Sequence, residues 1–432
     1  MKRDVVVIGG LRTPYSKANG AFSQWNAVDL GTMLLRELLA NHALSSSDID
    51  QVILGNVIQP AHATNISRVI ALSAGLAHEI PAHTVQRNCA SGLQAITDAA
   101  EKIQMGRCDV VVAGGVESMT HAPLMVDDSI AKTMLAWSKA KDWSQKLKAL
   151  RQLSLASFKP KSTLLQGLHD CTVGLNMGQT AEILARDFNI TRQAQDEFAL
   201  LSHQRAAQAW QDGWFDDEVM PLFPPPTRQM TQQDEGVRPQ QNKEALQKLR
   251  PVFSRPLGSV TAGNSSQISD GATMLILSDA EKAKDMGWPI MGFLHDWHYS
   301  GCDPSRMGLG PVFASDPLLS KYQLRFSDLN HVEINEAFSA QVLAVLEAMG
   351  SDRFSQEHFG HDSLGVPDPS QLNRYGGAIA MGHPVGASGA RLVLSVLRQL
   401  QKTSGLGLAS LCIGGGQGGA ILMGSEACKR YR

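Results

Sequence analysis

The chain alternates short apolar runs with longer stretches in which apolar residues recur every three or four positions. Three runs are rich in valine and isoleucine and contain or end in glycine: DVVVIGG near residue 4, QVILGNVI near residue 51 and DVVVAGG near residue 109. The stretches AVDLGTMLLRELLANH and SGLQAITDAAEKIQMG have helical periodicity. Strands that alternate with helices predict an α/β fold whose parallel strands are covered by helices on both faces.

Three segments of the first part of the chain recur, in the same order, in the last part. SDIDQVILGNV near residue 50 resembles SDLNHVEINEA near residue 330, and CASGLQAITDA at 89 resembles GASGARLVLSV at 386. DVVVAGGVESM at 109 resembles LASLCIGGGQGG at 408. Three matches in register predict two copies of one α/β unit. If a two-fold axis relates the copies, the loops before the two equivalent helices meet, and His383 stands beside Cys89.

The stretch between the copies has a different pattern. It is rich in helical segments such as MGQTAEILARDF and TRQAQDEFALLSHQRAAQAWQDG, and PLFPPPTRQ interrupts it. VTAGNSSQISDGATMLIL then returns to strand character. We therefore expect an N-terminal unit of residues 1–120 and 256–283, an inserted loop domain of residues 121–255, and a C-terminal unit of residues 284–432.

Composition narrows the classes of protein. The 432 residues are 43% hydrophobic and 19% charged, with a formal net charge of −2, which gives no general reason to expect a nucleic-acid partner. No apolar run approaches the roughly 18 residues that span a bilayer, and the start lacks a signal-peptide pattern. We expect a cytoplasmic protein. Its six cysteines form no C-x-x-C pair, so no metal site is predicted.

Four positions could carry chemistry. A free cysteine is more often a small buried hydrophobe than a reactive group, but Cys89 stands where a strand gives way to a helix, whose N-terminus stabilises a thiolate. His383 lies between small residues in GGAIAMGHPVGASG. The glycines after Cys412 either form a turn or expose N–H groups for an oxyanion. Asn335, in EINEAFSAQ, either forms a turn or orients a water toward a carbonyl oxygen.

Taken together, these motifs identify a family resemblance over essentially the whole chain. N-C-A-S-G at 88–92, V-T-A-G-N-S-S at 260–266, N-E-A-F at 335–338, G-H-P-V-G-A-S-G at 382–389 and C-I-G-G-G-Q-G at 412–418 resemble the thiolases. The resemblance implies two duplicated α/β units in a five-layer αβαβα sandwich, with an inserted CoA-binding loop domain, assembled as a homodimer or tetramer. It implies thiolysis of 3-ketoacyl-CoA in fatty-acid β-oxidation, or the reverse condensation of acetyl-CoA. CoA is then a substrate, and no cofactor is expected.

The resemblance also assigns roles to residues. Cys89 is the nucleophile that becomes acylated, His383 takes its proton, and Cys412 protonates the departing acetyl-CoA carbanion and later deprotonates CoA. His383 and a water held by Asn335 form one oxyanion hole, and the backbone N–H groups of Cys89 and Gly414 form the other. Six further residues fall on family positions that contact CoA or line the acyl path: Met177, Arg238, Phe253, Ser266, Met307 and Phe338. For the two methionines, simple packing is an equal alternative.

Two other functions share parts of this pattern. A decarboxylating ketosynthase has the duplicated fold and a nucleophilic cysteine, but it lacks a cysteine in the context of Cys412. A catalytically silent thiolase-like carrier of lipid or CoA has no need for Cys89, His383 and Cys412 together. The motifs leave the acyl chain length and the physiological direction open.

A basic segment, residues 130–161, carries seven Lys and one Arg against one Asp. Trp143, Leu147 and Leu150 fall at helical spacing, which predicts a basic amphipathic helix. Such a helix is either a solvated face or a contact surface. A segment of this kind resembles the β subunits of trifunctional fatty-acid oxidation complexes, which implies a hydratase/dehydrogenase α subunit or a membrane surface as partner. That branch commonly has His where this chain has Asn335, which favours a stand-alone acetyl-CoA acetyltransferase or a short-to-medium-chain thiolase.

Overall fold

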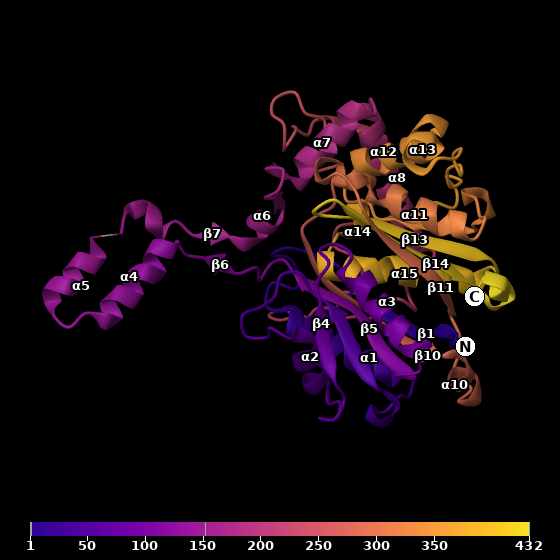
Figure 1. Cartoon of the computed structure of the whole chain (residues 1–432), viewed down its shortest axis with the longest axis horizontal. Helices are drawn as coiled ribbons and strands as arrows, with labels where there is room; N and C mark the ends of the chain where they lie inside the picture. The colour runs from indigo at the N-terminus through magenta and orange to yellow at the C-terminus, as the bar shows by residue number, and fades with distance from the viewer. Residues whose placement is uncertain (1, 152, 432) are drawn as a thin grey trace.

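A computed structural model describes residues 2–151 and 153–431, and its centre is one large mixed β-sheet (Figure 1). The ten strands follow the order β12-β13-β14-β11-β1-β10-β5-β3-β4, with β2 added beside β10. Their bounds are β1 Val5–Arg12, β2 Ser16–Lys17, β3 Gln51–Gly55, β4 Ala82–Val85, β5 Val110–Ser118, β10 Ser269–Asp279, β11 Gly292–Gly301, β12 His331–Ile334, β13 Leu406–Ile413 and β14 Gln417–Gly424.

The sheet consists of two halves with the same strand pattern. β3 is parallel to β5, β5 is antiparallel to β10, and β10 is antiparallel to β1. In the second half β12, β13, β14 and β11 repeat these relations in the same order. The halves join where β1 pairs with β11, with Val5 opposite Leu294. The repeated segments of the sequence thus occupy equivalent strands.

The sheet is mixed, because each half contains antiparallel pairs beside the parallel strands that the sequence predicts. Only β3–β4, β3–β5 and β12–β13 are parallel pairs. β13 and β14 are joined by the short turn at residues 414–416, and a hairpin connection forces antiparallel pairing. β1 is antiparallel to both of its neighbours, β10 and β11.

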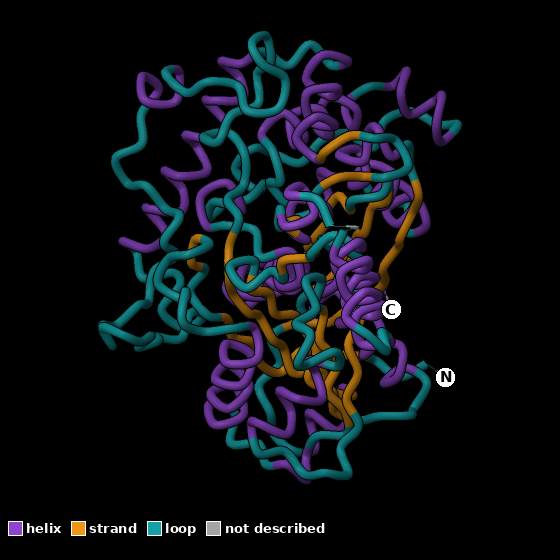
Figure 2. Tube along the Cα trace, turned by 90° about the vertical axis from the view of Figure 1, so that its left-hand side faces the viewer, coloured by secondary structure: helices purple, strands orange, loops and turns teal. Residues whose placement is uncertain are grey.

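Helices cover the sheet in three layers, which confirms the predicted five-layer αβαβα sandwich (Figure 2). α1 (Ala27–Asn41) and α2 (Ile66–Ala74) pack outside the first half, and α11 (Gly310–Lys321) and α12 (Ser339–Gly350) outside the second. Between the halves lie α3 (Ser91–Gln104) and α15 (Val385–Lys402), whose apolar residues share one core with both halves of the sheet.

The central helices touch at their N-termini, and small residues make this contact possible. A Cβ atom added at Gly92, at the start of α3, would lie 2.8 Å from the carbonyl oxygen of Gly386, at the start of α15. The A-S-G segments of both repeats therefore serve close packing of two helix starts. This contact brings the residues before α3 and the residues before α15 to one place.

Residues 121–255 supply most of the remaining helices. The segment contains β6 Leu124–Met125, α4 Asp128–Lys139, α5 Trp143–Leu150, β7 Lys161–Ser162, α6 Thr163–Gly167, β8 His169–Asp170, β9 Leu175–Asn176, α7 Met177–Asp187, α8 Arg192–Gln211 and α9 Lys243–Gln247. α10 Ala280–Asp285, α13 Asp352–Phe359 and α14 Ala378–Met381 complete the fold. After this segment the chain returns through β10, which lies between β1 and β5. No helix among the described residues is both long and apolar enough to cross a membrane.

The prediction of one basic helix over residues 130–161 is wrong. The chain is extended at Ala140 (φ −69°, ψ 126°), which ends α4. The side chain of Asp142 then accepts a hydrogen bond from the backbone N–H of Gln145, which starts α5 as a new helix. β6 and β7 pair as a two-stranded stem, and α4 and α5 stand beyond it, away from the body (Figure 1). We call residues 124–162 the arm.

Candidate active site

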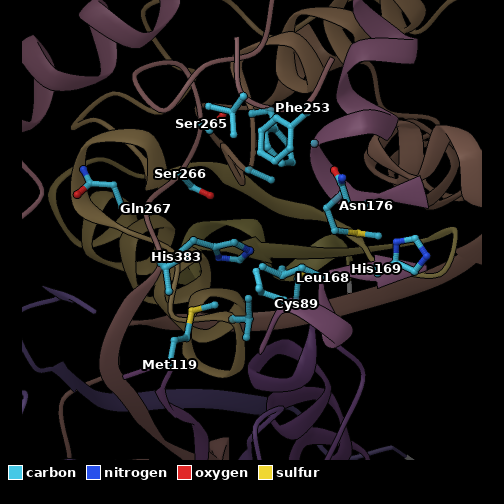
Figure 3. Close-up of a pocket in the computed structure, with 18 of the residues that line it drawn as sticks. Cys89, Met119, Leu168, His169, Asn176, Phe253, Ser265, Ser266, Gln267 and His383 are labelled. Carbon is cyan, nitrogen blue, oxygen red and sulfur yellow. The ribbon is translucent and has the colours of Figure 1, made fainter. Parts of the chain in front are cut away.

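The start of α3, the turn before α15 and the end of β13 converge on one pocket of about 1250 Å³. Cys89, His383 and Cys412 all line it. Figure 3 shows Cys89 and His383 in this pocket, the two residues that the two-fold argument brought together. Of the other candidates, Met177, Phe253, Ser266, Met307 and Phe338 also line this pocket. Its walls are largely apolar, and polar side chains such as His169, Asn176 and Gln267 stand on different sides of it (Figure 3).

Cys89 is held by a tight turn before α3. Asn88 takes a left-handed conformation (φ 43°), and its Nδ2 donates a hydrogen bond to the carbonyl oxygen of Gly414 at 2.7 Å. Burial is the largest influence on the pKa of the Cys89 thiol and raises it, whereas the backbone N–H groups of Gly414 and Cys89 lower it. The net pKa is raised, so the helix start does not make a resting thiolate. Cys89 needs a base to become a nucleophile.

His383 can be that base because its tautomer is fixed. Its Nδ1 lies 2.6 Å from Oγ of Ser388, and this hydroxyl donates its own proton to the carbonyl oxygen of Pro384 at 3.0 Å. Nδ1 therefore carries the ring proton, and Nε2 is the acceptor. Nδ2 of Asn335 lies 3.4 Å from Nε2. Burial, followed by the charge of Arg391, lowers the pKa of His383 to about 4, so the ring is neutral near pH 7.

Cys412 lies at the end of β13, with its side chain buried in the pocket wall. Burial is the main cause that raises its pKa, and the neighbouring Cys89 and Cys302 raise it further. Cys412 is therefore a neutral thiol that can give up a proton to a strong base. The turn that follows uses positive φ at Gly415 (93°) and Gly416 (78°), conformations that favour glycine.

The other predicted residues differ in how they meet the pocket. The rings of Phe253 and Phe338 pack edge to face at 5.9 Å, and the backbone N–H of Ser266 donates to the carbonyl oxygen of Ala337 at 2.9 Å. Asn335 is fully buried and reaches the site through its contact with His383 rather than as part of the pocket lining. Arg238 is exposed and is absent from the pocket lining.

A second pocket of about 490 Å³ opens on another side of Cys89. Gly414, Asn88 and Met119 line it, together with residues 163–172, which follow the arm. Cys89 and Met177 line both pockets. The nucleophile candidate thus stands where two spaces meet.

Sequence reasoning missed two residues that hold the site. Ser388 lies in the quoted G-A-S-G motif, but a serine at a helix start is usually a packing or capping residue. Glu117, in G-G-V-E-S-M, is buried, and burial raises its pKa to about 7. Its carboxyl group accepts backbone hydrogen bonds from Val57, Ile58 and Gly386, each at 3.0–3.1 Å. It thereby ties the start of α15 to the first half of the sheet.

Comparisons with known proteins agree with this fold. The sequence model of "Thiolase, N-terminal domain" matches residues 5–281, and that of "Thiolase, C-terminal domain" matches residues 288–425. The chain therefore belongs to the thiolase family. The family predicted from the motifs is confirmed, whereas the resemblance of the arm to trifunctional β subunits stays a prediction.

Individual relatives cover nearly the whole chain. A 3-ketoacyl-CoA thiolase of Yersinia pestis (strain Pestoides F) is 40% identical over 425 residues, which are 98% of this chain and 97% of the relative. The Bacillus anthracis acetyl-CoA acetyltransferase structure has a TM-score of 0.85 at 35% identity and covers 98% of this chain and 99% of that one. Human mitochondrial 3-ketoacyl-CoA thiolase in complex with CoA has a TM-score of 0.83 at 36% identity, with 98% of each chain covered.

Proposed function

We propose that this protein catalyses the thiolysis of 3-ketoacyl-CoA by CoA in fatty-acid β-oxidation, through an acyl thioester on Cys89. The observation that carries the proposal is that Cys89, His383 and Cys412 line one pocket. A transferase of this kind needs two thiols, because one must remain free as acid and base while the other is acylated. CoA enters as a substrate, and we expect no further cofactor.

In the first half-reaction, Nε2 of His383 takes the proton of Cys89, and the sulfur attacks the 3-keto carbon of the substrate. The bond between the second and third carbons then breaks, and its electron pair leaves with acetyl-CoA as an enolate. Cys412 gives its proton to the second carbon of that enolate. Acetyl-CoA departs, and the shortened acyl group remains on Cys89.

In the second half-reaction, the Cys412 thiolate takes the proton of an incoming CoA thiol. The CoA sulfur attacks the acyl carbon, the bond to Cys89 breaks, and His383 returns its proton to Cys89. The backbone N–H groups of Cys89 and Gly414 are proposed to hold the tetrahedral oxyanion, because both act on the Cys89 sulfur. His383 and a water held by Asn335 are proposed to hold the enolate oxygen, since Asn335 contacts His383.

The further substrate contacts are also part of this proposal. The pantetheine arm is proposed to pass Ser266, Phe253, Met307 and Phe338, which share the larger pocket with Cys412. Met177 is proposed to border the acyl path, because it lines both pockets. Arg238 is proposed to meet the nucleotide end of CoA, which fits an exposed position outside the pocket.

A thiolysis assay over 3-ketoacyl-CoA chain lengths tests the proposal. Wild-type protein is expected to convert each accepted substrate and CoA into equal amounts of acetyl-CoA and shortened acyl-CoA. Cys89→Ser is expected to fold and bind CoA but to lose thiolysis. A silent carrier would bind without turnover, and a ketosynthase would release carbon dioxide from an added malonyl thioester without cleaving the 3-ketoacyl-CoA, so either result contradicts the proposal. The same assay reports the preferred chain length, for which Asn335 favours short to medium chains.

We also propose that the arm binds an anionic membrane surface. Trp143, Leu147 and Leu150 on α5 are 71%, 56% and 43% exposed, and Met134 and Phe158 are exposed beside them. Lys141, Lys146 and Lys148 lie on or next to α5 in the sequence, and Nζ of Lys146 lies 5.0 Å from the ring centroid of Trp143. Basic and apolar residues are combined in this way in helices that lie in a lipid headgroup region. A hydratase/dehydrogenase α subunit is the other occupant that the resemblance implied, and it is an outcome of the test below.

Vesicle sedimentation with purified protein tests the arm. Full-length protein is expected to bind vesicles that contain anionic phosphatidylglycerol more strongly than neutral phosphatidylcholine vesicles. Replacing residues 135–160 by a short Gly-Ser linker is expected to abolish this binding while activity on soluble substrate persists. Equal binding by both proteins, or binding of an added α subunit without any vesicle binding, contradicts the membrane proposal. Light scattering on the same samples tests the expected homodimer or tetramer.

A further inference from the structure

A buried ion pair lies directly behind the histidine of the site. Nη1 of Arg391, on α15, donates to Oε2 of Glu333, on β12, at 2.8 Å. The two side chains are only 3% and 1% exposed. Neither residue lines either pocket around Cys89, so the pair does not touch the substrate space.

This pair connects the two elements that hold His383 from opposite sides. Arg391 follows Ser388 by three positions, so both side chains leave the same face of α15. Glu333 lies on β12, and Asn335 is the first residue after that strand, where its backbone N–H still donates to Ser410 of β13. Ser388 holds Nδ1 of His383, and Asn335 contacts Nε2. The contacts therefore form a closed ring that runs from the histidine through α15, the ion pair and β12.

A purely stabilising role explains this pair poorly. Desolvation of two buried charges often cancels their attraction, so a buried ion pair is a weak contribution to stability. Here the desolvation is incompletely repaid, because Nη2 of Arg391 and Oε1 of Gln399 are buried without a hydrogen-bond partner among the described residues. Nε2 of Gln399 donates a long hydrogen bond of 3.4 Å to Glu333. Apolar side chains of similar volume would fill the same space without the free-energy cost of desolvating charges. Apolar packing is non-directional, however, whereas a hydrogen-bonded ion pair fixes the relative position of its two partners.

We propose that Arg391 and Glu333 are positioning residues that fix the register of β12 against α15, and with it the Asn335 amide against the His383 ring. The inference rests on the proposed function, because it assigns the pair to the reaction at Cys89. A small shift of β12 along α15 moves Asn335 relative to His383. Because neither Arg391 nor Glu333 lines a pocket, we expect the pair to act more on turnover than on CoA binding.

The first test is Arg391→Met, with Glu218→Gln as a control that breaks another buried Arg–Glu contact. Glu218 accepts from Nε of Arg12 at 2.6 Å, and the two side chains are 1% and 0% exposed. Its charge is only a minor influence on the pKa of Glu333, after burial, Arg391 and Glu336. We expect Arg391→Met to lower kcat by on the order of ten- to hundredfold with KM for CoA within about twofold, as for a misplaced catalytic group. Glu218→Gln is expected to lower the melting temperature and leave kcat near wild type. Equal kcat losses in both variants overturn the proposal.

The second test removes both charges with Arg391→Met/Glu333→Leu, which leaves no unpaired buried charge. We expect wild-type-like thermal stability together with the low kcat of the single variant, and Arg391→Lys is expected to recover part of kcat. Recovery of wild-type kcat by the apolar double variant overturns the proposal. The rate of Cys89 alkylation by iodoacetamide at neutral pH gives a readout without thiolysis, and Arg391→Met is expected to slow it. If Cys89 is alkylated faster in the wild-type protein than in Arg391→Met but the wild-type protein has no thiolysis activity, the proposed function is contradicted and the positioning role is not.

Discussion

Nδ1 of His383 donates a hydrogen bond to Oγ of Ser388, 2.6 Å away, and this contact decides which ring nitrogen can accept a proton. The serine hydroxyl does not donate to Nδ1, because it donates its own hydrogen bond to the carbonyl oxygen of Pro384. Nε2 is thus left as the base, on the side where Asn335 approaches. The account of catalysis given above depends on this orientation.

Ser388→Ala removes the acceptor of the Nδ1 proton, so we expect the imidazole to lose its preferred tautomer. One such hydrogen bond contributes roughly 1–1.5 kcal/mol, which corresponds to about a tenfold loss of kcat. KM for CoA is expected to stay near wild type. Steady-state kinetics beside Ser395→Ala, a change two turns further along the same helix, checks this. Equal kcat values for the two variants would contradict the role of Ser388.

Cys412→Ala separates the two thiols. We expect this variant still to accept an acyl group on Cys89 from a simple thioester, because the His383 base remains in place. The rate at which the acetyl-CoA methyl protons exchange with deuterium oxide is expected to fall by on the order of a hundredfold or more, because the thiol that acts as acid and base in this step is gone. Mass spectrometry and NMR measure the two steps, and Cys108→Ala, between α3 and β5 and outside both pockets, is the control. Normal exchange in Cys412→Ala would remove the assigned acid–base role.

The pH dependence of stability should report the buried neutral state of His383. Its pKa falls from 6.5 to about 4, so between these values the unfolded chain binds a proton that the folded protein does not. Stability from this group is therefore complete above pH 6.5 and is lost as the pH falls, at about 1.4 kcal/mol per pH unit. The difference in unfolding free energy between wild type and His383→Gln is expected to shrink by roughly 3 kcal/mol from pH 7 to pH 4. Denaturant titrations measure the unfolding free energy of each protein at several pH values. If the difference between the two proteins is the same at pH 7 and at pH 4, the pKa of His383 is not lowered by folding.

Gly92→Ala tests the contact between the central helices. The new Cβ would meet the backbone carbonyl of Gly386, which cannot move without shifting α15. We expect a loss of roughly 1–3 kcal/mol of unfolding free energy, typical of overpacking. Gly167→Ala is the control, because a Cβ there meets no atom within 4 Å. A Gly92→Ala protein as stable as the control would mean that the helix starts have room to separate.

The repeat in the sequence was sufficient to predict how the reactive residues meet. Cys89 and His383 precede equivalent helices, and the small residues of A-S-G at both helix starts indicated the close approach that the structure has. Cys412 was a candidate because it ends an apolar run and is followed by a run of glycines. These features are local in sequence and repeated, so a single chain contains enough information to find them.

Other features depend on contacts that no local pattern carries. Arg391 and Glu333 are 58 positions apart, and their pairing appears only once β12 and α15 pack together. The two helices of the arm are separated by the cap at Asp142, a short-range signal hidden within a longer amphipathic pattern. The antiparallel setting of β1 follows from which strands flank it in the sheet, and its apolar sequence fits either direction.

The acylation of Cys89 is the central claim, and intact-protein and peptide mass spectrometry test it most directly. Protein is mixed with a 3-ketoacyl-CoA in the absence of free CoA, and the reaction is quenched in acid. We predict one shortened acyl group on the peptide that contains Cys89 and one equivalent of released acetyl-CoA, and no adduct in Cys89→Ser. An unmodified Cys89, or an acyl group found on another residue of the active protein, would contradict the account.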